Sequence, residues 1–258
     1  MRVDPRIIRR RLEVAEEQAR SRVRRSLTLL LAMAGAGCVA WFFASPLMSV
    51  RAVVVDGASR SAVDEILSGA KVVEGRPMVA IRVGAIEEHL VADPWIESAS
   101  VKVVFPTTVE VAVREREPIA WIRLEDQWGL LADGGLLVEY ADSPTPIRSL
   151  IRIPVEDPGL GAAVENENVS GALQFLGALP EDLARRSVAK VVDEELWVLV
   201  GYRSVRIGLP VEMEAKAASL VAMINTAHGG VIDVTAPSRP AIRSLDTAGE
   251  VLSDSVDV

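Results

Sequence analysis

Few residues of this 258-residue chain stand at spacings that could support catalysis. Ser68 and Lys71 have the serine–x–x–lysine spacing that penicillin-binding enzymes use to place a nucleophilic serine beside a lysine. Those enzymes also need a Ser-x-Asn and a Lys-Thr-Gly element, and the sequence contains neither. We therefore interpret Ser68 as the end of a short helix and Lys71 as a surface lysine.

Metal and phosphate chemistry are equally poorly supported by the spacing of residues. The only two histidines, His89 and His228, lie in different halves of the chain, whereas metal sites need clustered ligands. The adjacent carboxylates at 87–88 and 194–195 point to opposite sides of a helix or strand, so solvated faces are expected. The two glycines at 229–230 follow a predicted helix, which indicates a helix stop and not a phosphate loop. The sequence predicts no catalytic residue, no cofactor and no metal.

One uncharged run, residues 26–50, dominates the N-terminal part of the chain. As a helix it would be about 37 Å long, enough to cross a hydrocarbon layer of about 30 Å. The aromatic residues at 41–43 suit a membrane–water boundary. Residues 1–25 hold nine arginines and four acids, so the positive-inside rule predicts a cytoplasmic N-terminus with residues 51–258 on the outer side.

A cleaved signal peptide is the main alternative reading of this run. The apolar region of a signal peptide spans about 7–15 residues. Residues 44–46, Ala-Ser-Pro, are a candidate cleavage site for a signal peptidase. The uncharged run is longer than such an apolar region, and bulky aromatics stand where small residues would be expected. Cys38 faintly resembles a lipoprotein cleavage site, but the apolar run continues past it. We expect a basic cytoplasmic tail at 1–25 and a retained transmembrane helix at 26–48.

The charge balance of residues 51–258 narrows the possible partners. This part carries 19 Lys and Arg against 32 Asp and Glu, whereas a nucleic-acid-binding surface is basic. Its length favours two small domains or one elongated domain. The single cysteine, Cys38, lies in the membrane run, so no disulfide is expected outside it.

The first half of this external part has the pattern of a small α+β unit. Val109, Val111 and Val113 alternate with polar residues, which is typical of a half-buried strand. The expected elements, in order, are a strand at 50–56, helices at 61–69 and 82–92, and strands at 96–104 and 109–113. This order predicts two helices on one face of a three-stranded sheet.

The second half is mostly strands with flanking helices. The expected strands are 121–124, 128–132, 136–138, 196–200, 204–209 and 231–235, and the expected helices are 168–179 and 210–227. Pro237 and Pro240 are expected to stop the strand at 231–235 from continuing as an inner strand. The polar, acidic residues 244–258 are expected to be a disordered tail.

Five short motifs in this order resemble the FtsQ/DivIB family of bacterial cell-division proteins. They are the Pro-Trp-Ile of residues 94–96, the strand pair around Phe105-Pro106, the domain junction at 115–120, the hairpin turn at 131–135, and the Ile-Asp-Val of 232–234. Phe105 replaces the tryptophan that is usual in the family. The resemblance covers nearly the whole chain, behind a correctly oriented anchor.

This resemblance implies a domain order and a role. It implies a single N-terminal transmembrane helix, a POTRA-like domain at 49–117 and a mostly antiparallel β domain at 118–243. The implied role is a non-enzymatic membrane scaffold at the division septum of the inner membrane. Its implied partners are bitopic proteins of the FtsB/DivIC and FtsL types and other divisome membrane proteins, with support of septal peptidoglycan synthesis. The alternatives are a membrane-anchored envelope enzyme acting on peptidoglycan and a POTRA-bearing secretion component.

The strand at 231–235 is the candidate partner-binding site. A terminal strand at a sheet edge accepts a partner strand through backbone hydrogen bonds. The predicted partner-binding residues are Val231, Ile232, Asp233, Val234, Thr235 and Arg239. The resemblance implies an aromatic or basic residue after Val234, and this chain departs from it with Thr235 and Ala236. Arg239 and Arg243 are therefore candidates for partner choice. A strand that is already paired on both sides stays an open alternative.

Overall fold

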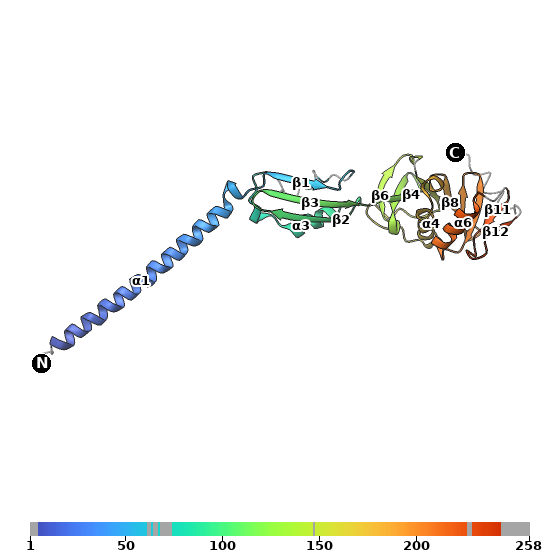
Figure 1. The fold of residues 1–258 in the computed structure, drawn as a ribbon. Coiled ribbons are helices and arrows are strands. Elements are labelled where there is room, and N and C mark those ends of the chain that lie inside the picture. Colours follow the sequence, from blue (N-terminus) through green and yellow to red (C-terminus); the bar gives the residue numbers. More distant parts are fainter. Residues whose placement is uncertain are drawn as a thin grey trace. The chain divides into compact units, whose positions relative to one another are not determined.

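The computed structural model describes residues 5–60, 63, 67, 74–146, 148–225 and 229–243, with side chains from residue 24 onward except that of residue 44. The chain folds as two compact units. One contains the N-terminal helix and most of a three-stranded sheet, and the other contains a nine-stranded sheet with its helices (Figure 1). The α+β fold class predicted from the sequence is confirmed.

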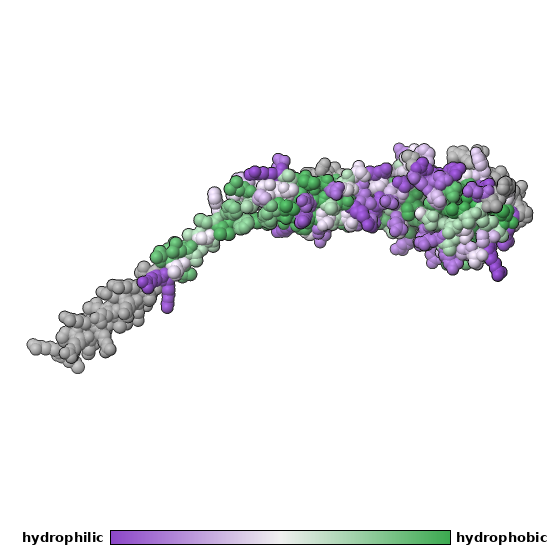
Figure 2. Space-filling model, in the orientation of Figure 1, coloured by the Kyte–Doolittle hydropathy of each residue, from purple (hydrophilic) through white to green (hydrophobic). Residues whose placement is uncertain are grey.

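Helix α1 (Pro5–Ala44) is longer than the predicted anchor. It begins inside the basic tail, where Pro5 takes the first helical position that proline favours. It ends before residue 48 because Pro46 disfavours helical geometry in the residue before it, and a short 3-10 turn, η1 (Pro46–Met48), follows. Among the described residues, Arg24–Phe43 is the one helical segment long and apolar enough to cross a membrane. Its predominantly apolar surface is visible in Figure 2.

The three-stranded sheet has the strands that the alternating pattern predicts. They are β1 (Ala52–Asp56), β2 (Ile96–Val104) and β3 (Thr108–Glu115), in the order β1-β3-β2, and β1 runs parallel to β3. Val109, Val111 and Val113 of β3 are buried, as their alternation with polar residues predicts.

Helix α3 (Val83–Val91) confirms the predicted helix at 82–92. Ile86 and Leu90 are buried, and Glu87 accepts a hydrogen bond from the backbone N–H of Val101, at 2.9 Å, through its Oε1. The predicted helix at 61–69 lies mostly outside the described residues.

The nine-stranded sheet is mixed, with five antiparallel and three parallel pairs. Its strands are β4 (Pro118–Arg123), β5 (Trp128–Ala132), β6 (Leu137–Ala141), β7 (Ser149–Arg152), β8 (Ser187–Val192), β9 (Glu195–Val200), β10 (Arg203–Gly208), β11 (Val231–Asp233) and β12 (Ala241–Arg243). Their order is β12-β11-β10-β9-β8-β7-β4-β5-β6. Strands β7, β8 and β12 are absent from the sequence-based prediction, which was wrong at these positions.

The main core of this unit lies between the sheet and two helices, α4 (Glu167–Gly177) and α6 (Met213–Met223). Alternate strand positions face it, including Ile122, Ile151, Val198 and Ile232. The helices contribute Phe175, Leu176 and Leu220 among others. A short helix, α5 (Glu181–Ala184), leads into β8.

Helices α4 and α6 meet closely because of a glycine. A β-carbon added at Gly171 of α4 would lie 2.5 Å from the Cβ of Pro210, so a larger residue would push the loop before α6 away. Helix α6 begins at Met213 and not at Pro210 as predicted, because Glu212 adopts a left-handed backbone (φ 54°, ψ 40°). Its end at Met223 is also earlier than predicted.

Candidate functional site

The predicted partner-binding residues lie together but not at the edge of the sheet. Val231, Ile232 and Asp233 form β11, which pairs with β10 on one side and with β12 on the other. Val234 and Thr235 follow it directly. The prediction that residues 231–235 present the free edge is therefore wrong, although partner binding by this region stays a prediction. Among the described residues, the strand at this edge is β12.

The sequence analysis missed β12 because the two prolines before it were interpreted as the end of the sheet. Pro237 and Pro240 instead shape the connection between β11 and β12, and β12 starts directly after Pro240. Three residues are too few to show an alternating pattern. The sequence signal for β12 was Ile242, an apolar residue that follows the two prolines and precedes the acidic residues 244–258. In the structure Ile242 is 47% exposed.

The hydrogen-bond direction of β11 identifies the backbone groups that face outward on β12. Val234 N–H donates to the carbonyl of Arg206 on β10, at 3.0 Å. Successive residues of a strand direct their N–H and C=O to opposite sides, so residues 231 and 233 direct theirs to β12. Their register partners are Arg243 and Ala241. Ile242 therefore directs its own N–H and C=O away from β11, toward the open side of the edge.

A glycine allows β12 to lie this close to the start of β11. Gly230 has a positive φ of 78°, and a β-carbon there would lie 2.2 Å from the carbonyl oxygen of Arg243. Any other residue at 230 would be strained and would displace the end of β12.

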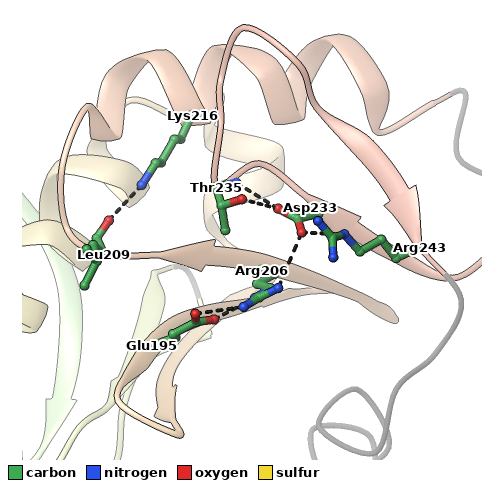
Figure 3. Close-up of polar contacts among 7 residues, drawn as sticks. All are labelled: Glu195, Arg206, Leu209, Lys216, Asp233, Thr235 and Arg243. Atoms are coloured by element: carbon green, nitrogen blue, oxygen red, sulfur yellow. Dashed lines mark hydrogen bonds and ion pairs between the residues drawn. The ribbon is translucent and has the colours of Figure 1, made fainter.

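A row of alternating charges crosses the last four strands (Figure 3). At its centre is Asp233 of β11, which is only 3% exposed. Arg243 of β12 places its Nε 2.7 Å from Asp233 Oδ2. Arg206 of β10 places its Nη1 3.6 Å from the same oxygen, and Glu195 of β9 accepts two hydrogen bonds from Arg206, at 2.6 and 2.8 Å. We call these four residues, Glu195, Arg206, Asp233 and Arg243, the charge ladder.

Polar contacts also hold the connection between β11 and β12. Asp233 Oδ1 accepts hydrogen bonds from the backbone N–H and the hydroxyl of Thr235, at 3.0 and 2.6 Å. The Ser219 hydroxyl of α6 donates to the carbonyl of Pro237, at 2.8 Å. Arg239 N–H donates to Ala236 in a tight turn, at 2.9 Å. The predicted site residues Thr235 and Arg239 therefore belong to this connection.

The electrostatics of Asp233 favour its charged form. Burial alone would raise its pKa, but the two bonds from Thr235 and the guanidinium groups of Arg243 and Arg206 outweigh burial and hold the pKa below its usual value. The hydrogen bonds from Arg206 likewise lower the pKa of Glu195. Both carboxylates are thus ionised and paired at neutral pH.

We expect this pairing to lose its stabilising effect in acid. Because the folded-state pKa of Asp233 is lowered, its contribution to stability is complete above the unfolded value of about 3.9 and is lost as the pH falls through the lower folded value. Asp233→Asn should therefore lower the free energy of unfolding by about 1–3 kcal/mol at pH 6. Unfolding experiments at several pH values should show this difference shrinking below pH ~4. A difference independent of pH down to 2 would contradict the pairing.

Lys216 of α6 is a second buried charge in this region, and is 1% exposed. Its Nζ donates to the carbonyl of Leu209, at 2.7 Å (Figure 3). Burial lowers the pKa of this amine. Because it binds a backbone carbonyl at the end of β10, we assign it a structural role in fixing the start of α6.

Of the remaining candidates from the sequence, the structure describes only some. Ser68, Lys71 and His228 lie outside the described residues. Glu87 binds a backbone N–H, and Glu195 belongs to the charge ladder. Within the described part of the chain, no group of three or more His, Cys, Asp or Glu residues could hold a metal ion.

A cavity of about 590 Å³ opens after β4 and β7. Arg123, Arg152, Glu125 and Glu156 line it together with apolar residues of the 153–155 segment. Its opposite charges balance, so its lining selects neither an anionic nor a cationic ligand. The β12 edge, with its outward backbone groups, is the stronger candidate site.

Comparisons with known proteins agree with this architecture. Residues 48–116 match the family model of the FtsQ-type POTRA domain. The cell division protein FtsQ of Mycobacteroides abscessus is 29% identical over 222 residues, which cover 84% of this chain and 68% of the relative. The chain is thus similar to FtsQ proteins over most of its length, and its residues 48–116 match the FtsQ-type POTRA domain. FtsQ of Mycolicibacterium smegmatis is 28% identical over 77% of this chain and 58% of the relative.

Other FtsQ proteins are similar to this chain over shorter stretches. FtsQ of Anaeromyxobacter sp. is 32% identical over 125 residues, 45% of this chain and 42% of the relative. The chain spans about two thirds or less of the length of the mycobacterial relatives it matches. This similarity to FtsQ proteins supports a role in cell division.

Proposed function

We propose that this chain is a non-enzymatic, single-pass membrane scaffold that binds other proteins of the division septum. The relationship to FtsQ proteins supports the division role. The observation that carries the scaffold role is the β12 edge, where Ile242 offers an outward N–H and C=O. An extended peptide adds to such an edge through backbone hydrogen bonds.

The orientation in the membrane follows from charge. Nine arginines precede the apolar part of α1, so the N-terminus stays in the cytoplasm and the two folded units lie outside. In this proposal, residues 1–25 form the cytoplasmic tail and residues 49–117 the first external domain. Residues 118–243 form the second external domain.

The proposed occupant of the β12 edge is an extended segment of an FtsB/DivIC-type partner. Backbone hydrogen bonds with Ile242 provide the affinity, and the neighbouring side chains determine which partner binds. Val231, Ile232, Asp233 and Val234 support the edge from behind, while Thr235 and Arg239 shape the connection beside it. An FtsL-type protein and further divisome membrane proteins are proposed as additional partners, in support of septal peptidoglycan synthesis.

The test is localisation and capture of the full-length protein. A fluorescent fusion should concentrate at mid-cell in dividing cells, and the purified protein should capture the external segment of the FtsB/DivIC-type protein from the same cells. Protease added to spheroplasts should digest the external units and leave the tail protected. A fusion spread evenly around the membrane, or failure of capture, would reject the proposal. Hydrolysis of cell-wall fragments by the purified protein would instead favour the envelope enzyme.

A further inference from the structure

Strand β12 is weakly held by its backbone alone. It has three residues, and of the described strands only β11 pairs with it. Edge strands this short need additional contacts to stay in place. If β12 is to receive a partner strand, its position and register must be fixed before the partner arrives, because ordering it on binding would cost affinity.

The charge ladder fixes the register of β12. Asp233 pairs with Ala241, and Val231 pairs with Arg243, so Arg243 reaches Asp233 along the diagonal of one sheet face. A slip by one residue would turn Arg243 to the opposite face. A slip by two residues would take its guanidinium away from the buried carboxylate.

The carboxylate that receives Arg243 is itself held in place. Thr235 binds one of its oxygens from the connection. On the other side, Arg206 faces Asp233 and is clamped by Glu195. Arg243 is 56% exposed at the side chain, but its anchor is buried, so solvent screens this pair less than an exposed surface pair.

We infer that Asp233 is the positioning residue of the partner-binding edge: its buried carboxylate holds β12 in register through Arg243, with Arg206 and Glu195 fixing the carboxylate. This inference rests on the proposed function for the role of the edge, while the holding of β12 stands on the ladder itself. Since Asp233 is buried, it acts on a partner strand only through β12.

The test uses the full-length protein in detergent with three variants: Asp233→Asn, Arg243→Gln and the double variant. Asparagine keeps an oxygen for Thr235 but removes the charge. Hydrogen exchange of the free protein at the β12 amides that face β11, those of Ala241 and Arg243, measures how well the strand is held. Capture of the FtsB/DivIC-type external segment measures binding. The matched control is Arg185→Gln, which breaks the ion pair with Glu181 on α5, outside the ladder.

We expect each single variant to speed exchange of the β12 amides by about tenfold and to weaken capture by a similar factor. Exchange of the α4 amides should be unchanged, and the control should match the wild type. The double variant should be no worse than Asp233→Asn alone, because both changes remove the same contact. If Asp233→Asn fails to fold, Arg243→Gln, at an exposed position, decides by the same measurements.

Two results would overturn the inference. Unchanged exchange of β12 in both single variants would show that the ladder does not hold the strand. Faster exchange with undiminished capture would show that the strand's position does not matter to the partner. Failure of the wild type to capture the segment would reject the proposed function, and exchange would then decide on the ladder alone.

Discussion

Ile242→Pro is expected to weaken capture of the FtsB/DivIC-type segment by about tenfold to a hundredfold, because it removes one backbone donor and leaves the partner's carbonyl unpaired at the interface. Proline removes the one N–H of β12 that faces outward. It leaves the inward groups of Ala241 and Arg243 in place, and edge strands tolerate proline where the lost donor faces solvent. The measurement is titration of the labelled segment onto full-length protein.

The matched control for this variant is Ile242→Val, which keeps the N–H and a branched apolar side chain. It should bind almost as the wild type does. Val234→Pro is unsuitable for this test, because Val234 N–H donates inward to Arg206 and its loss would damage the sheet. Equal binding by Ile242→Pro and Ile242→Val would show that the partner docks on another surface.

The periodic parts of the fold were predictable from the sequence. The valines of β3 alternate cleanly, because one face of that strand is buried and the other is solvated. The strands at 196–200 and 204–209 were also predicted, and the structure confirms them as the antiparallel neighbours β9 and β10.

Strands β7 and β8 were missed because serines stand at their inward positions. Ser149 and Ser187 are each 1% exposed. Their hydroxyls donate to the carbonyls of Ala184 and Leu183, both at 2.8 Å. Each serine is the first residue of its strand, so a buried polar residue stands where the apolar pattern would begin, and the partner of Ser149, 35 residues away, is revealed only by the fold.

The free edge of the sheet was predicted one strand away from where the structure has it. The Ile-Asp-Val of 232–234 drew attention to this end of the sheet, but its pairing on both sides depends on β12, a strand that only three residues encode. The charge ladder was also beyond sequence reasoning, since its four residues come from four strands. A local sequence pattern does not show which charged side chains lie next to each other across a sheet.

Phe175→Ala is expected to have the largest effect on stability, lowering the free energy of unfolding of the β unit by about 3–5 kcal/mol. Phe175 is fully buried in α4, between the sheet and α6, where close contact at Gly171 limits how far the helices can collapse into a cavity. The matched control is Gln174→Ala, on the exposed side of the same helix, which should change stability by about 0.5 kcal/mol or less.

Hydrogen exchange of the full-length protein gives the measurement without assuming that both units unfold together. The slowest amides of β9, an inner strand of the sheet, report opening of the whole unit. They should exchange at least a hundredfold faster in Phe175→Ala, as ~3 kcal/mol or more requires. If the exchange rate rises less than tenfold, neighbouring side chains fill the space that the ring leaves. Helix α4 would then cover the sheet that carries the β12 edge without depending on Phe175.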